Sequence, residues 1–133
     1  MQVVIFRLNN ELFAVETAKV QSINNAMGIT KVPKAPAYIK GLVNLRGNVI
    51  SLLDINLLMD IPKSGKSENS IIILEMEDEL VGVTVDQVDE VLDLEENVIE
   101  KINDEKKKAY IEGIINLDNR VVTLINIDKL LSN

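Results

Sequence analysis

Carboxylates are the side chains with the most scope for chemistry in this chain, because its 133 residues include 21 Asp and Glu but no Cys and no His. That composition excludes zinc sites with Cys or His ligands, thiol nucleophiles, serine–histidine triads and disulfide bonds. Paired carboxylates would serve acid–base catalysis. The candidate acids lie at strand ends or in charged stretches, with no partner at a suitable spacing: Asp54, Asp60, Asp86, Asp93 and Asp128.

No other motif supplies a reactive centre or a cofactor site. The stretches DLEEN and NDEKKK lack the central glycine of a calcium loop, and the isolated Gly41, Gly47 and Gly113 do not form a phosphate-binding loop. Each carboxylate is therefore expected to be a solvated surface group. We predict a protein that is not an enzyme and holds neither metal nor cofactor. The rival interpretation is an enzyme of small metabolites built on a β-barrel.

The composition predicts a mainly β fold. The chain contains 17 Ile and 15 Val against 16 Leu and 6 Ala, and β-branched residues fit a pleated sheet better than a helix. Only four residues are aromatic, so platforms for stacking nucleic-acid bases are missing. No apolar run approaches the ~20 residues that cross a bilayer. We therefore expect a soluble, cytoplasmic protein without direct membrane insertion.

The net charge of −7 is unevenly distributed along the chain. Residues 1–66 carry eight Lys and Arg and four Asp and Glu, which sums to +4, whereas residues 67–133 carry six and seventeen, which sums to −11. A negative total gives no electrostatic reason to bind nucleic acid. The split either orients the protein between two partners of different charge or reflects one more acidic solvated face.

The two halves of the sequence repeat each other. Residues 37–59 match residues 109–131 at an offset of 72, with ten of 23 positions identical. Residues 3–15 match residues 71–83 more weakly at an offset of 68, which places four extra residues near the charged run 103–108. Such a duplication predicts two pseudo-symmetric copies of one unit.

Each copy predicts about five short strands, the size of a small barrel. A first hairpin joins strands 3–8 and 11–16, or 70–76 and 79–85. A helical turn then leads into a third strand, in TAKVQSI and DQVDEVL, and a second hairpin turns at Arg46-Gly47 or Asp118-Asn119. Short helical turns, INLLM and IDKLL, close the copies. The segment 94–102 has helix-like spacing, and 62–69 is the predicted linker.

The strands are more apolar than a one-sided sheet requires. In NVISLLDI both alternating sets of side chains are largely apolar. One face is expected to fill a barrel interior, and the other to pack on the second barrel or to remain as a patch that binds a partner. The predicted barrel subdomains are 1–66 and 67–133, and strand 3–8 is a candidate for exchange into the other barrel.

Residues 30–59 closely resemble the signature of the bacterial chemotaxis coupling proteins, the CheW family, whose module also forms the regulatory domain of the histidine kinase CheA. The matching positions are Pro33, Pro36, Tyr38-Ile39-Lys40-Gly41, Asn44-Leu45-Arg46-Gly47 and Leu53-Asp54. The resemblance extends over essentially all 133 residues. It departs at Ser51, where the family usually has Pro, at Asn56, often Arg, and at Ser22, where an acid is common.

This resemblance implies a single CheW-like domain over 1–133, made of two five-stranded SH3-like barrels packed together. It also implies a non-enzymatic adaptor that couples chemoreceptor tips to CheA, in arrays at the inner face of the membrane. Because the chain lacks the kinase's ATP-binding and phosphotransfer regions, a standalone adaptor is favoured over a kinase fragment.

The resemblance further implies positions for the contacts. Receptor contacts are expected at Val20, Arg46, Ile71, Gly82 and Val91, and kinase contacts at Glu11, Thr17 and Val49. The four apolar receptor positions are equally plausible as core residues. Gly41, Gly47 and Gly113 are expected to be structural. Arg46 occupies a turn position that favours Asn, Asp or Gly, so either it is a solvated charge or its guanidinium serves a partner.

Overall fold

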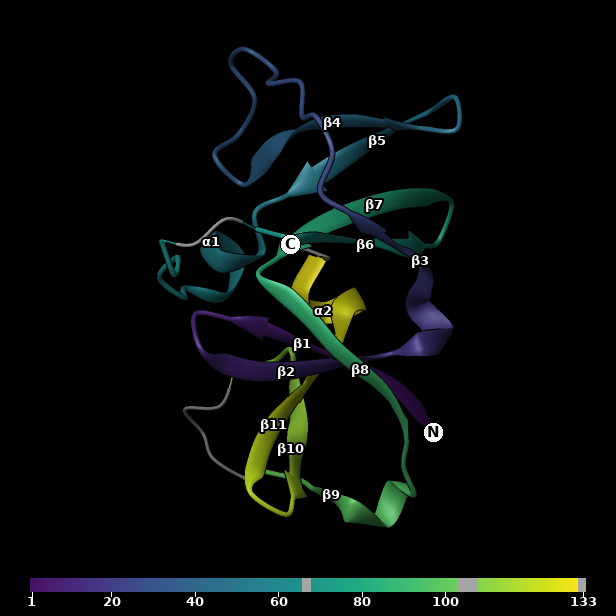
Figure 1. Cartoon of the computed structure of the whole chain (residues 1–133), viewed down its shortest axis with the longest axis vertical. Helices are drawn as coiled ribbons and strands as arrows, with labels where there is room; N and C mark the ends of the chain where they lie inside the picture. Colours follow the sequence, from purple (N-terminus) through teal and green to yellow (C-terminus); the bar gives the residue numbers. More distant parts are fainter. Residues whose placement is uncertain (66–67, 103–107, 132–133) are drawn as a thin grey trace.

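The repeated sequence forms eleven strands and four short helical segments in a computed structural model, which describes residues 1–65, 68–102 and 108–131 (Figure 1). The strands are β1 (Gln2–Leu8), β2 (Glu11–Glu16), β3 (Val20–Asn25), β4 (Ile39–Leu45), β5 (Asn48–Leu53), β6 (Ser70–Met76), β7 (Glu79–Val85), β8 (Gln87–Asp93), β9 (Ile99–Glu100), β10 (Ile111–Leu117) and β11 (Arg120–Ile125). The helices are α1 (Ile55–Met59) and α2 (Ile127–Leu131), and η1 (Thr17–Lys19) and η2 (Glu96–Val98) are 3-10 turns. The predicted mainly β fold with short helical turns is confirmed.

The strands form two sheets that each draw on both halves of the sequence. Sheet A has the order β8-β1-β2-β11-β10-β9, and sheet B has the order β3-β6-β7-β5-β4. Hairpin β1–β2 therefore lies among strands of the second half, and hairpin β6–β7 among strands of the first. Exchange between the halves was considered for strand 3–8 alone. In the structure both strands of hairpin β1–β2 are exchanged, and hairpin β6–β7 is exchanged in the opposite direction. The limits 1–66 and 67–133 thus describe the sequence repeat and not the composition of the sheets.

Strand register follows the repeat in both sheets. β11 pairs in parallel with β2 at Leu124 and Ala14, and the equivalent residues Leu52 and Gly82 pair β5 with β7. Segments 39–59 and 111–131 have the same secondary structure, residue for residue, as predicted. The halves differ where β9 pairs with β10, because the counterpart in sheet B is a single bridge between Thr30 and Leu42.

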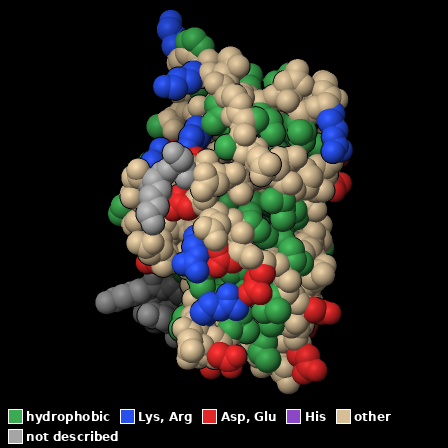
Figure 2. Space-filling model, in the orientation of Figure 1, with side chains coloured by type: hydrophobic (Ala, Val, Ile, Leu, Met, Phe, Trp, Pro, Cys, Tyr) green, Lys and Arg blue, Asp and Glu red, His purple; other side chains and the backbone are tan. Residues whose placement is uncertain are grey.

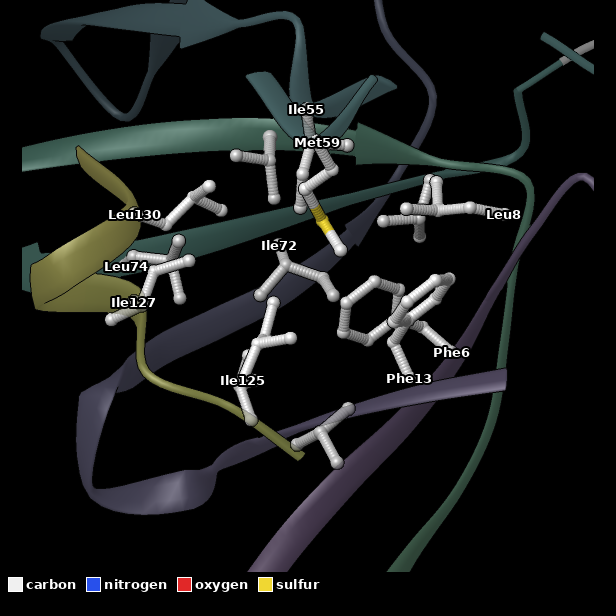
Figure 3. Close-up of a cluster of buried hydrophobic side chains, with 14 of the residues drawn as sticks. Phe6, Leu8, Phe13, Ile55, Met59, Ile72, Leu74, Ile125, Ile127 and Leu130 are labelled. Atoms are coloured by element: carbon white, nitrogen blue, oxygen red, sulfur yellow. The ribbon is translucent and has the colours of Figure 1, made fainter. Parts of the chain in front are cut away.

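The central core lies between the two sheets and is shared by both. Phe6 and Phe13 of sheet A stack with ring centroids 6.0 Å apart. Figure 3 shows them with Ile72 and Leu74 of β6 and with side chains from both helices, such as Met59 and Leu130. Two smaller clusters lie on the strand faces that point away from this central core. One surrounds Ile5 and Leu124 of sheet A, and the other surrounds Leu52 and Ile73 of sheet B. Both faces of the strands are thus used, as their apolar sequences predicted.

Two glycines allow close approach between strands. A Cβ on Gly41 would lie 2.6 Å from the carbonyl oxygen of Thr30, and one on Gly113 would lie 2.7 Å from that of Glu100. These distances are below van der Waals contact, so a side chain would displace backbone. Gly47 has open space around it, but its φ of 86° is one that other residues rarely adopt.

Other local predictions had mixed outcomes. In TAKVQSI a helical turn, η1, leads into β3 as predicted, whereas DQVDEVL forms β8 without one, since the pairing of β8 with β1 begins at Gln87. In 94–102 the helix-like spacing produces only η2 and the short β9. Part of the predicted linker (66–67) and most of the charged run (103–107) lie outside the described residues.

Candidate interaction surfaces

Strands β3 and β8 follow the exchanged hairpins and carry equivalent apolar residues toward the surface. Val20 and Val88 begin this pattern and pack partly buried against the central core. Ile23 and Val91, also equivalent at the offset of 68, are 41% and 49% exposed. Sequence reasoning selected Val20 and Val91 for receptor contact but missed Ile23 and Val88, which the repeat offset would have identified. Figure 2 shows hydrophobic side chains exposed over both sheets on one face.

The other two apolar positions expected to contact receptors lie inside sheet B. Ile71 is 1% exposed, and a Cβ on Gly82 would lie 2.5 Å from Cδ2 of Leu52. Both belong to the interior of the sheet, which is the alternative stated for them. A partner would not touch these residues unless the sheet opened, so any effect on binding would pass through neighbouring side chains.

Arg46 stands at the tip of hairpin β4–β5 with its backbone in the left-handed region. Its φ is 54°, followed by 86° at Gly47, the sequence of angles of a type I′ turn. The Gly47 N–H donates to Oδ1 of Asn44 at 3.0 Å, which fixes the turn. The Arg46 side chain is exposed and makes no hydrogen bond or ion pair with the described residues. A non-glycine residue at such a φ costs roughly 1–2 kcal/mol, so Arg46 is a locally unfavourable choice.

The three positions expected to contact the kinase come from both sheets. Glu11 begins β2, and Thr17 follows its other end, where its hydroxyl donates to the carbonyl oxygen of Gln2 at 3.2 Å. Val49 lies on β5 in sheet B and is 67% exposed. Its equivalent in sheet A, Val121, is 60% exposed and lines a hollow of about 530 Å³ together with Glu11. Val121 was missed, although the offset of 72 pairs it with Val49.

Several of the acids considered for catalysis have structural partners. Asp54 caps α1 by accepting the Leu57 N–H at 3.1 Å and also pairs with Lys63. Asp86 accepts the N–H of Asn9 at 2.9 Å. Among the described residues no group of three or more acidic side chains is placed to hold a metal ion.

Ion pairs tie the sheets and their strands together. Lys19 of η1 lies 2.7 Å from Asp128 of α2, and the hydrogen bond and charge of Asp128 raise the pKa of Lys19. In sheet A the guanidinium of Arg7 donates two hydrogen bonds to Asp89, at 3.0 and 3.1 Å.

Burial, together with the nearby charge of Asp60, raises the pKa of Tyr110.

Charged side chains of the two signs are distributed unevenly over the surface. In Figure 2 Lys and Arg predominate in the upper part of the molecule, and Asp and Glu in the lower part. This agrees with the unequal charge of the two halves of the sequence. Within the described ranges, no helix has the length and apolar character needed to span a membrane.

Comparison with known proteins assigns the chain to a family. Residues 2–133 match the model of the CheW-like domain. The chain is 32% identical to the chemotaxis protein CheW of Klebsiella aerogenes, over 97% of this chain and 80% of that protein, and 30% identical to that of Bacillus subtilis, over 98% and 86%. The crystal structure of the scaffolding protein TtCheW from Thermoanaerobacter tengcongensis has a TM-score of 0.86 and 34% identity, over 97% of this chain and 86% of that one. With this fold and this match over nearly its whole length, the chain belongs to the CheW family of chemotaxis proteins.

Proposed function

We propose that the protein is a non-enzymatic adaptor that couples the cytoplasmic tips of chemoreceptors to the histidine kinase CheA in signalling arrays at the inner face of the membrane. The match to the CheW-like domain over residues 2–133 carries this proposal. The similarity to a protein described as a scaffold supports it. So does the pairing of three of the candidate catalytic acids, Asp54, Asp86 and Asp128, with structural partners.

Receptor binding is proposed for the surface of β3 and β8 and for the tip of hairpin β4–β5. Val20, Val91 and Arg46 reach solvent there, and Ile23 joins them because it is equivalent to Val91. Apolar side chains at equivalent places on two strands suit a helical partner that runs across both. Ile71 and Gly82 act on this surface only by supporting β6 and β7 from within.

Kinase binding is proposed for the exposed valines and the residues beside them. Val49 offers an apolar contact on sheet B, and Glu11 and Thr17 lie at the two ends of β2 in sheet A. Because these positions belong to different sheets, they would serve two separate contacts. Val121, which lines a hollow with Glu11, extends the contact on sheet A.

Reconstitution from purified components tests the proposal. Receptor-containing membranes, CheA and the purified chain are mixed, and CheA that sediments with the membranes is measured together with its phosphorylation rate. Both are expected to depend on the chain. Incubating the chain alone with nucleotides and divalent metals is expected to give no turnover. CheA recruitment that is independent of the chain, or turnover by the chain alone, would refute the adaptor function.

A further inference from the structure

The β3–β4 connection, residues 26–38, is held in place by backbone hydrogen bonds. Thr30 and Leu42 form a bridge in which the N–H of each donates to the carbonyl oxygen of the other, at 2.9 and 2.8 Å. At the far end the N–H of Asp54 donates to the carbonyl oxygen of Tyr38 at 2.8 Å. The connection contains neither helix nor strand, but these bonds fix its path at the upper end of the molecule (Figure 1).

The middle of the β3–β4 connection is a turn that contains a locally unfavourable residue. The Ala35 N–H donates to the carbonyl oxygen of Val32 at 3.4 Å, which places Pro33 and Lys34 at the two central positions. Proline at the first of these and a positive φ of 64° at the second are the features of a type II turn. Such a turn favours Gly or Asn at the place of Lys34. Because the Lys34 side chain is exposed, packing does not explain the lysine.

Positive charge gathers around this connection without acids beside it in the sequence. Residues 17–53 contain five Lys and Arg but no Asp and no Glu. Two of the five cations are paired with acids from other segments, Lys19 with Asp128 and Lys40 with Glu68. Lys31 and Lys34 are exposed and have no hydrogen bond or ion pair with the described residues. The upper end of the molecule, where Figure 2 shows Lys and Arg, therefore has a positive potential.

Exposed apolar side chains accompany the two free cations. Val32 and Tyr38 are 39% and 42% exposed. The repeat partner of Tyr38 at the offset of 72 is Tyr110, which packs against the central core and donates its hydroxyl hydrogen to the carbonyl oxygen of Met59 at 3.5 Å. The Tyr38 hydroxyl has no hydrogen bond to the part of the chain that the structure describes. The first half thus leaves in solvent an aromatic side chain whose counterpart the second half packs.

We propose that residues 29–38 of the β3–β4 connection dock an acidic segment of a partner protein. Carboxylates of this segment pair with Lys31 and Lys34, and charge complementarity selects the sign of the partner. Apolar side chains of the segment pack against Val32 and Tyr38 and remove them from water. Because the turn and the bridge fix the backbone in advance, binding costs little conformational entropy. The surface lies outside those assigned to receptor and kinase and does not depend on the proposed function.

An anionic membrane fits this surface less well than an acidic protein segment does. Lipid headgroups attract clusters of roughly four to eight basic residues. The β3–β4 connection offers two lysines, and the whole chain carries a net charge of −7, which a membrane of the same sign repels. A short protein segment needs only a few aligned contacts, and the exposed apolar side chains add to them.

Designed peptides provide the probe. The first has the sequence ELEDLEDL, the second, QLQNLQNL, has no charge on its side chains, and the third, ESEDSEDS, has no apolar ones. Each is titrated into the isotope-labelled full chain while its amide signals are followed by NMR. ELEDLEDL is expected to shift the signals of Lys31, Lys34 and Tyr38 and to bind at least about fivefold more tightly than either control peptide. Equal affinity for ELEDLEDL and a control peptide, or no shift at these residues, would overturn the proposal.

Variants of the chain locate the binding. Lys31→Gln/Lys34→Gln should bind ELEDLEDL at least about fivefold more weakly than the unaltered chain does. A control with the same loss of charge, Lys101→Gln/Lys108→Gln, changes exposed lysines outside the connection and should bind normally. Lys34→Asn relieves the positive φ, so it is expected to raise the melting temperature while it weakens binding. Unchanged affinity in the Lys31→Gln/Lys34→Gln variant, or an equal loss in the control, contradicts the site.

Two other occupants are tested with the same samples. Vesicles of phosphatidylcholine and phosphatidylserine are expected not to sediment the chain. Sedimentation that Lys31→Gln/Lys34→Gln abolishes would assign the surface to lipid and overturn the proposal. Shifts of the same NMR signals that grow with the concentration of the chain itself, without peptide, would assign the surface to a second copy and overturn it as well.

Discussion

Hairpins β4–β5 and β10–β11 share one backbone but present different chemistry. Both have a bulge before an equivalent glycine, both pair in parallel with an exchanged hairpin, and both lead into a five-residue helix. Yet the first turns at Arg46-Gly47 and the second at Asp118-Asn119. The duplication has preserved the apolar contacts, whereas polar side chains and turns have diverged. The contact proposed for Arg46 therefore lies where the halves differ, whereas the apolar contacts proposed for β3, β8, β5 and β11 lie where the halves agree.

The largest expected effect concerns the core that both sheets share. Phe6→Ala removes a ring that is 1% exposed and should lower the free energy of unfolding by about 3–5 kcal/mol. Because each sheet contains strands from both halves, the loss should reach sheet B as well. Hydrogen exchange at Ile72 and Leu74 is expected to accelerate together with that of β1. Protection retained in sheet B would show that the sheets unfold independently.

The two close-packed glycines should respond alike. Gly41→Val and Gly113→Val place a side chain against the backbone of Thr30 and Glu100, and each should cost roughly 1–3 kcal/mol by urea unfolding. Gly28→Val is the matched control, since nothing lies within 4 Å of the added Cβ. A large loss at only one of the two glycines would mean that the halves are less equivalent than their register indicates.

Much of the backbone could be predicted from sequence because its signals are local. Alternating β-branched runs and two-residue turns placed the strands of the four hairpins to within about two residues, and the offset match placed α1 and α2. The reciprocal exchange of hairpins was not decidable in this way. Since Leu52 and Leu124 meet equivalent partners in either arrangement, the same local pairings arise whether a hairpin stays with its own half or crosses over.

The sites were less predictable than the fold. The alternation of residues along β6 and β7 does not tell which face of the strand is buried, so Ile71 and Gly82 could have been surface residues. Their contacts with Leu52 of β5 show that they are buried inside sheet B. Lys40 and Glu68 are 28 residues apart, and no local pattern links them. By contrast, Ile23 and Val121 could have been found, because each is the repeat partner of a residue already selected.

A stabilising change is expected at the first turn. Asn tolerates a positive φ better than Arg does, so Arg46→Asn should raise the free energy of unfolding by about 0.5 kcal/mol. A gain in stability with a loss of receptor coupling would separate the two roles of this position. Thermal unfolding measures the first part, and a decrease in stability would show that the Arg46 side chain contributes to the fold.

The smallest expected effect is on alkaline stability. The ion pair with Asp128 raises the pKa of Lys19. The contribution of this ion pair to the free energy of unfolding is therefore complete below the unfolded-state pKa of about 10.4, and it is lost as pH rises through the higher folded-state pKa. Lys19→Met should therefore show a smaller loss of stability than the unaltered chain between about pH 8 and about pH 11. Lys31→Met, at an exposed site, is the control. Identical pH profiles of stability for Lys19→Met and the unaltered chain would show that the ion pair does not contribute to alkaline stability.

Arg46 provides the most direct test of the proposed adaptor function at a position where the halves differ. Arg46→Ala and its counterpart Asp118→Ala are compared with the unaltered chain, first by thermal unfolding and then by CheA recruitment and activation on receptor membranes. Both variants should fold with stability changed by no more than about 0.5 kcal/mol. Arg46→Ala is expected to weaken assembly at least about fivefold, about 1 kcal/mol, while Asp118→Ala assembles normally. If both variants recruit and activate CheA as the unaltered chain does, the proposed role of Arg46 in receptor coupling is contradicted.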